Sequence, residues 1–328
     1  MRRRITHRWA DPDAPAAPIF GTAMSSTIAP AQERRLLGIG LALAAYFLFV
    51  CLDSSAKWLG LAGIPALQVM FVRYAVHLGL AAGINLPRKG LGLLRTQNLT
   101  LEMLRAAALV GSTLCNFTAV RYLPLTVTGA ISFTVPLIIT ALSVFILHEA
   151  VGWRRWLAII VGFVGVLIIV RPGSDVFHPA TLLSLGGAVS YACYALLTRR
   201  LAGIDSAGTQ QFYGAALPTL VLAPLALANW VWPDSLLGWV ILSLIGIIGF
   251  SGHQFITVAH RYAPASVLAP FSYLQIFFFA AASLFIFNQP PDVWFFAGAP
   301  VVIGSGLYIW LRERALHRAA TAVEAAER

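Results

Sequence analysis

Long apolar stretches separated by short polar segments run through the chain from about residue 36 to residue 311. Several of these stretches reach the roughly 20 residues that a helix needs to cross a bilayer. Their apolar residues do not alternate with polar ones, which excludes the strands of a transmembrane barrel. The pattern therefore predicts an all-α integral membrane protein with ten transmembrane helices, at about 36–57, 66–86, 101–120, 125–147, 153–171, 180–200, 207–229, 236–258, 265–287 and 292–311.

The segments at the two ends are polar and short. Residues 1–35 mix Arg, Ala, Pro, Ser and Thr, a composition that predicts a disordered cytoplasmic tail. Translation from Met1 and translation from Met24 are both compatible with this tail. Residues 312–328 are expected to form a basic cytoplasmic tail, so neither end leaves room for a soluble domain.

A pattern in the first half of the chain recurs 140 residues later. The segment Val120–Glu149 is echoed by His260–Gln289, so that Phe133 falls on Tyr273. This repeat divides the chain into residues 36–173 and 174–311, with five predicted helices in each unit. Because five is odd, the second unit enters the membrane from the opposite side. The sequence therefore predicts two inverted five-helix repeats, a recurring architecture of secondary transporters.

The basic residues agree with a multi-pass protein of a bacterial inner membrane. The formal net charge is +10, and most of the 23 Lys and Arg residues fall on one side of the predicted helices. Cytoplasmic loops collect Lys and Arg, so both termini are expected in the cytoplasm. The basic residues are scattered singly or in pairs, which argues against nucleic-acid binding. The three cysteines lie inside predicted helices and do not indicate a disulfide framework.

Several motifs that would indicate an enzyme are absent from the sequence. It has no Gly-x-x-x-x-Gly-Lys-Ser/Thr loop for ATP, no His-Glu-x-x-His, no Cys-x-x-Cys and no Gly-x-Ser-x-Gly elbow. The histidines are not spaced as a metal site. We therefore expect no enzymatic activity, no metal and no cofactor.

Three motifs link the chain to a known family. The segments Arg121-Tyr122-x-Pro124, Trp153-Arg-Arg-Trp156 and Arg171-Pro172-Gly173 resemble the EamA half of carriers in the drug/metabolite transporter superfamily. The resemblance covers nearly everything from Leu36 to Leu311. It implies two inverted five-helix halves with a central cavity, no tightly bound cofactor and no ATP hydrolysis. The segment from Pro270 to Gln275 looks most like the subgroup that includes S-adenosylmethionine uptake carriers.

Ionisable residues inside the apolar stretches are the first candidates for a site, because a charge in a membrane helix is costly and needs a partner. Asp53 and Lys57 are four residues apart, on one face, and can neutralise each other. Either they meet a charged substrate or they form a pair at the membrane interface. Arg73 is expected to pair with Asp53 or to bind a substrate anion. His77, one turn deeper, is a candidate for coupling.

Uncharged polar residues extend this set. Ser184, Gly187, Tyr191, Tyr194 and Thr198 form a stripe along one helical face. Tyrosines on such a stripe can bind a planar ligand, or the stripe can hold helices together. Pro136 and Pro270 leave backbone carbonyls unpaired and are expected to point inward. The predicted substrate contacts are Asp53, Arg73, Asn116, Tyr191, Tyr194, Gln254, Tyr273 and Gln275.

A second set is predicted to couple or gate transport and comprises Lys57, His77 and Glu149. Glu149 belongs to one repeat only, since Gln289 replaces it in the other. The glycines, among them Gly165 and Gly304, are expected to mark points of close helix packing.

The predicted function is secondary transport of a small organic metabolite across the inner membrane by alternating access, with a monomer sufficient. S-adenosylmethionine, an amino acid and a flavin remain alternative substrates, as do import and export, with or without proton coupling. A membrane-embedded enzyme and a non-transporting scaffold are the alternatives of a different class.

Overall fold

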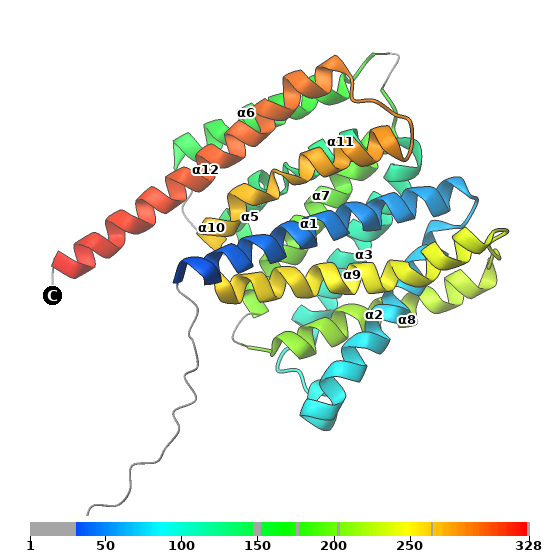
Figure 1. Cartoon of the computed structure of the whole chain (residues 1–328). Coiled ribbons are helices and arrows are strands. Elements are labelled where there is room, and N and C mark those ends of the chain that lie inside the picture. Colours follow the sequence, from blue (N-terminus) through cyan, green and yellow to red (C-terminus); the bar gives the residue numbers. More distant parts are fainter. Residues whose placement is uncertain (1–30, 147–151, 175–176, 202–203, 264, 327–328) are drawn as a thin grey trace, which may run out of the picture.

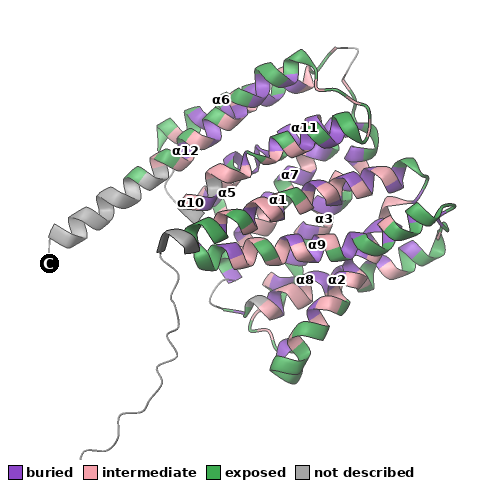
Figure 2. Ribbon diagram, in the orientation of Figure 1, coloured by how far each residue is buried: buried purple, intermediate pink, exposed green. Residues whose placement is uncertain are grey.

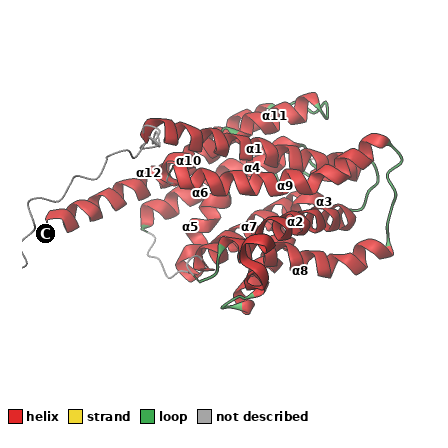
Figure 3. Ribbon diagram, turned by 60° about the horizontal axis from the view of Figure 1, so that its bottom comes forward, coloured by secondary structure: helices red, strands yellow, loops and turns green. Residues whose placement is uncertain are grey.

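The computed structural model describes all residues except 1–30, 147–151, 175–176, 202–203, 264 and 327–328. The described chain is built of α-helices, one 3₁₀ helix and short loops (Figure 1, Figure 3). The helices are α1 (Ala31–Leu61), α2 (Ala66–Lys89), η1 (Gly90–Leu94), α3 (Leu99–Tyr122), α4 (Leu125–Ser132), α5 (Val135–Ile146), α6 (Trp153–Val170), α7 (Ala180–Leu201), α8 (Ala207–Ala228), α9 (Leu236–Tyr262), α10 (Ala265–Ser272), α11 (Gln275–Phe285) and α12 (Val293–Ala326).

Each predicted apolar stretch is mainly helical over its described residues, and two of them are broken into a pair of shorter helices. Nine helical segments of the described chain are long and apolar enough to cross a membrane, and Pro270–Phe285 is a shorter apolar segment. Helices extend beyond the predicted stretches at both ends. α1 already begins at Ala31, and α12 continues as a helix through most of the expected tail, past the bundle (Figure 1).

The first and second halves of the chain interlock through matched helix pairs. α1 packs on α9, α3 on α7, α2 on α8 and α6 on α12, and each pair joins a helix from each half. Figure 2 shows buried residues on the faces that meet and exposed residues on the outer faces. Large apolar side chains on those outer faces, such as Leu220 and Phe285, are exposed. In a membrane protein such side chains are in contact with lipid.

The two helix breaks fall at equivalent positions of the repeat. α4 gives way to α5 at Phe133–Thr134, and α10 gives way to α11 at Tyr273–Leu274, 140 residues later. Pro136 explains the first break, because a proline ring clashes with the carbonyl four residues earlier. The second break has Ile276 at the equivalent position. There the backbone closes in tighter turns, with Tyr273 N donating to Pro270 O at 3.3 Å and Ile276 N to Tyr273 O at 3.2 Å.

Several glycines allow close approaches between helices. A side chain at Gly165 on α6 would place its Cβ 2.8 Å from Val302 Cγ2 and 3.0 Å from the Gly298 carbonyl on α12. Close packing was also expected at Gly304, but no atom lies within 4 Å of a Cβ built there. That expectation was wrong, because the bare side of Gly304 points away from the neighbouring helices.

These two glycines make a matched pair for a stability test. Gly165→Leu should destabilise the protein by about 1–3 kcal/mol, because the added side chain forces α6 and α12 apart. Gly304→Leu should change stability by less than about 0.5 kcal/mol, as is usual at an open surface position. Thermal unfolding of the purified variants in detergent measures both. Equal melting temperatures for the two variants would contradict this account of the α6–α12 contact.

Candidate functional site

A cavity of about 290 Å³ lies between the two halves, at the centre of the bundle. Both broken helices contribute to it, through Ser132, Phe133, Val135 and Pro136 on one side and Ser272, Tyr273 and Gln275 on the other. The helices α1, α2, α3, α7 and α9 complete the wall with Tyr46, Phe49, Leu52, Asp53, Arg73, Leu109, Ser112, Thr113, Asn116, Phe117, Ser184, Gly187, Ala188, Tyr191 and His253. Unwound backbone beside a cavity is typical of binding sites in transporters.

Asp53 and Arg73 are the charged side chains among the lining residues. Asp53 Oδ1 accepts a hydrogen bond from Asn116 Nδ2 at 2.9 Å. Arg73 is 5% exposed, and its Nη1 donates to Thr113 Oγ1 at 2.9 Å. Its Nε has no hydrogen-bond partner among the residues that the structure describes. This atom lies against α9, 3.2 Å from the position of a Cβ built on Gly249, and a buried donor without a partner is costly.

Aromatic rings form much of the remaining wall. Phe133 and Tyr273, which occupy equivalent repeat positions, meet with ring centroids 5.7 Å apart. Phe49 contacts His253 at 5.1 Å in an edge-to-face arrangement. The Tyr273 ring also needs Gly306 on α12, because a Cβ there would overlap the tyrosine hydroxyl. The cavity thus combines one carboxylate and one guanidinium with aromatic surfaces, a mixture suited to an amphipathic organic ligand.

Most of the predicted substrate contacts come together in this cavity. Asp53, Arg73, Asn116, Tyr191, Tyr273 and Gln275 all line it. Tyr194 instead accepts a hydrogen bond from Arg105 at 3.1 Å, and Gln254 Nε2 lies 3.4 Å from Gln211 Oε1. The predicted tyrosine stripe on α7 is therefore divided between the cavity and a separate polar cluster.

The structure contradicts the predicted pairing of Asp53 with Lys57. Lys57 Nζ donates to the Leu123 carbonyl at 2.6 Å and to Gln289 Oε1 at 2.8 Å. Leu123 is the C-terminal cap of α3, where unpaired carbonyls and the helix dipole attract a cation. The spacing of four residues places both side chains on one face, but the long lysine stem reaches this helix end instead.

His77, also predicted to gate transport, is not among the residues of the cavity wall. His77 is buried beside the rings of Phe250 and His253, at 5.2 Å and 6.2 Å, and its Nε2 has no partner in the described chain. Glu149 lies outside the described residues. The predicted inward position holds for Pro136, which lines the cavity, whereas Pro270 precedes the second break and is not among the lining residues.

Sequence reasoning missed a buried cluster around Arg105. Glu102 and Arg105 are 0% and 4% exposed, and their side chains are 3.4 Å apart. In the sequence, Arg105 is only one of the basic residues on the side expected to face the cytoplasm. The available signal was a Glu-x-x-Arg spacing inside an apolar stretch, since residues three apart on a helix are neighbours.

A cavity between two interlocking sets of apolar helices, two of them broken beside it, is typical of membrane carriers. The family comparison agrees, because the model of the EamA-like transporter family matches residues 36–171 and 178–311. The chain belongs to the EamA-like transporter family, as its sequence motifs predicted.

Curated relatives include carriers of different substrates. An S-adenosylmethionine uptake transporter of Rickettsia prowazekii is 32% identical over 194 residues, which cover 58% of this chain and 65% of the relative. This chain thus spans slightly less than two thirds of that relative. A riboflavin transporter of Vibrio cholerae is 31% identical over 81% of this chain and 90% of its own. The pseudopaline exporter CntI of Pseudomonas aeruginosa is 28% identical over 81% of this chain and 93% of its own.

A solved crystal structure shares the fold, with a TM-score of 0.59 at 19% identity, over 87% of this chain and 99% of the other. The family model and the names of the curated relatives agree with the predicted class, a multi-pass transporter-type membrane protein. They also confirm the resemblance to S-adenosylmethionine carriers at the level of the subgroup.

Proposed function

We propose that the protein carries a small organic metabolite with both a cationic and an anionic group, bound in the central cavity. The observation that supports this most directly is the presence of Asp53 and Arg73 in one cavity wall without an ion pair between them in the described chain. A substrate ammonium or sulfonium group near Asp53 and a substrate carboxylate on Arg73 balance both charges. Arg73 suits a carboxylate because its planar guanidinium can donate two parallel hydrogen bonds.

The charge balance favours a dipolar substrate over a neutral one. A neutral ligand would leave Asp53 with only Asn116 and Arg73 with only Thr113 as side-chain hydrogen-bond partners in the described chain, which is costly for buried charges. Among the substrates of the relatives, S-adenosylmethionine carries an amino acid group and a sulfonium, whereas riboflavin is uncharged at neutral pH. The aromatic walls formed by Phe133, Tyr191 and Tyr273 accommodate a planar ring in either case. The cavity therefore supports a substrate of the amino-acid-containing class.

Alternating access is the proposed mechanism, with ten membrane helices arranged as two inverted repeats. Three observations support it: the cross-half helix pairs, the two breaks 140 residues apart, and the cavity between the halves. The loop charges favour both termini in the cytoplasm. The wall formed by α4 and α5 and the wall formed by α10 and α11 would then change sides together as the halves rock.

Metabolite profiling of cells and medium, with and without the gene, tests this proposal. The compound whose distribution changes should contain both an amine or sulfonium group and a carboxylate, and purified protein in vesicles should transport it. An uncharged compound, reproduced in vesicles, would eliminate the dipolar substrate class while retaining transport. Unchanged distributions of all detected compounds, with the protein present in the membrane, would contradict the transport function.

Two uncharged wall residues give a milder prediction. Tyr191→Leu and Gln275→Leu should each lower the transport rate by about 2- to 10-fold, because each loses contacts worth about 0.5–1.5 kcal/mol. Tyr308→Leu is the control, since Tyr308 is exposed on α12 and outside the cavity wall. Initial rates in vesicles, normalised to folded protein, are the measurement. Wild-type rates for both wall variants would remove them from the site.

A further inference from the structure

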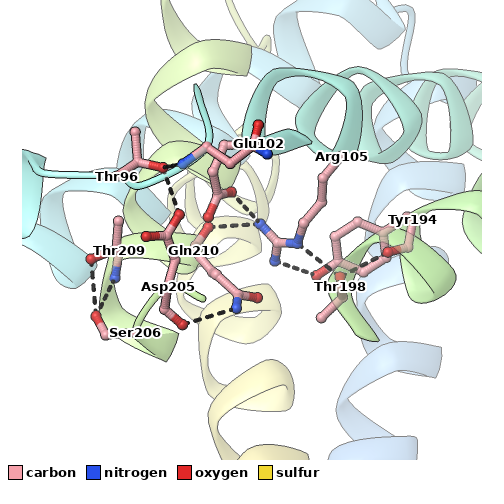
Figure 4. A network of polar contacts seen from close by, with 10 residues as sticks. Thr96, Glu102, Arg105, Tyr194, Thr198, Asp205, Ser206, Thr209 and Gln210 are labelled. Carbon is pink, nitrogen blue, oxygen red and sulfur yellow. Dashed lines mark hydrogen bonds and ion pairs between the residues drawn. The ribbon is translucent and has the colours of Figure 1, made fainter. Parts of the chain in front are cut away.

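The Arg105 cluster joins three helices through one guanidinium (Figure 4). Nε donates to Thr198 Oγ1 at 2.8 Å and Nη2 to the Tyr194 hydroxyl at 3.1 Å, both on α7. Nη1 donates to the Gln210 carbonyl on α8 at 2.8 Å and to Glu102 on α3 at 3.4 Å. The guanidinium also stacks on the Tyr194 ring, 4.8 Å from its centroid. One side chain of the first half therefore holds two helices of the second half.

This cluster lies directly beyond one end of the cavity. Leu109 on α3 and Tyr191 on α7 are both lining residues. One helical turn further along each helix, in the same direction, come Arg105 and Tyr194, which are hydrogen bonded to each other. The bonded pair joins α3 and α7 at this end. The Tyr191 and Tyr194 rings, 5.6 Å apart, connect the cavity wall to the cluster.

The opposite end of the bundle has different chemistry at the equivalent positions. The shift of 140 residues places Glu102 on Leu242 and Arg105 on Ile245, both buried in an apolar cluster on α9. The shift of 142 residues that relates the first helices of the two halves places Tyr194 on Leu52 and Thr198 on Ala56. Leu52 and Ala56 belong to that same apolar cluster. The repeat thus provides a polar contact at one end and an apolar contact at the other.

We propose that the Arg105 cluster, defined as Glu102, Arg105, Tyr194, Thr198 and Gln210, is the gate at the α3 end of the cavity. The substrate passes this end only after Arg105 releases Tyr194 and Thr198 and α7 moves away from α3. This gate rests on the proposed carrier function. Because its bonds are directional and charge-assisted, the gate has one well-defined closed arrangement. The equivalent positions at the other end are apolar, so the two ends respond differently to substitution there.

Accessibility of a single cysteine in the cavity tests the gate without any substrate. In full-length protein with Cys51, Cys115 and Cys193 replaced by alanine, Ser112→Cys supplies one thiol in the cavity wall. A membrane-impermeant maleimide is then applied separately to each membrane face. Arg105→Met should raise the labelling rate roughly 5-fold or more from the face at which α3 begins, a typical size for coupling between sites. Labelling from the other face should not rise.

Two further variants test whether misfolding or a general loss of helix packing could explain the labelling. Tyr194→Phe combined with Thr198→Val removes two acceptors of Arg105 while leaving both buried charges in place, and should shift labelling in the same direction. Arg200→Met, an exposed arginine on the same end of α7, should leave the rate unchanged. Unchanged labelling in the double variant, or an equal rise from both faces, would overturn the gate. Because the assay uses no substrate, failure to find transport would not affect its outcome.

Discussion

Arg73→Lys should lower the transport rate by about 10- to 100-fold, with the protein still folded. Lysine keeps the charge but cannot offer two parallel donors to a carboxylate, and it loses the bond that Arg73 Nη1 makes to Thr113. Hydrogen bonds to charged groups contribute about 1.5–3 kcal/mol each, which gives this range. The measurement is the initial rate in vesicles with the compound identified by profiling.

The matched control is Arg171→Lys. Arg171 pairs with Asp292 outside the cavity and is partly exposed, so a change there should leave the rate close to that of the unmodified protein. Asp53→Asn should behave like Arg73→Lys, because it removes the carboxylate that balances the substrate cation. Full activity in Arg73→Lys would contradict bidentate recognition. Full activity in both cavity variants would contradict the dipolar substrate class.

Lys57→Met should destabilise the protein by about 1–3 kcal/mol, the cost of leaving a buried hydrogen-bonding group without its partner. Lys57 is 1% exposed, and its ammonium satisfies the last carbonyl of α3 and the Gln289 side chain at once. It also lies 5.0 Å from the Phe287 ring centroid, so the charge is stabilised without a carboxylate. Thermal unfolding in detergent is the measurement.

The chain offers a control in its other lysine. Lys89, at the end of α2, donates to Ser206 at 2.7 Å in an exposed position. Lys89→Met should change stability by less than about 0.5 kcal/mol, because water replaces the lost bond. Equal destabilisation by the two substitutions would show that the buried contact of Lys57 carries no special energy. The bond between Lys57 and Gln289 would then add nothing to the stability of the bundle.

The cavity residues differ in how well the sequence indicated them. Asp53 and Arg73 were found because a charge in an apolar stretch is costly and must face the interior. Tyr191 and Tyr194 lie on one helical face, so helical periodicity predicts the same role for both. Only the packing of α7 against α3 separates them, since Tyr191 reaches the cavity and Tyr194 reaches Arg105.

The same limit explains the wrong ion pair. Sequence spacing shows that Asp53 and Lys57 share a face, but it does not show which groups of other helices lie within reach. Lys57 donates hydrogen bonds to the end of α3, 66 residues away in sequence, and to Gln289, 232 residues away. Arg105 was overlooked for a related reason. Its partners on α7 and α8 are distant in sequence, so it resembled an ordinary basic residue near a helix end.

The sequence by itself determined the class, the helical segments and the repeat, because the cost of exposing polar groups to lipid imposes a strong and local pattern. It also determined which residue types had to be buried. The tertiary structure decided which of those residues share a cavity, where the two helices break, and that Arg105 and Lys57 join the halves. Those features depend on contacts between side chains of different helices, and a local sequence pattern does not determine which of these side chains lie close together.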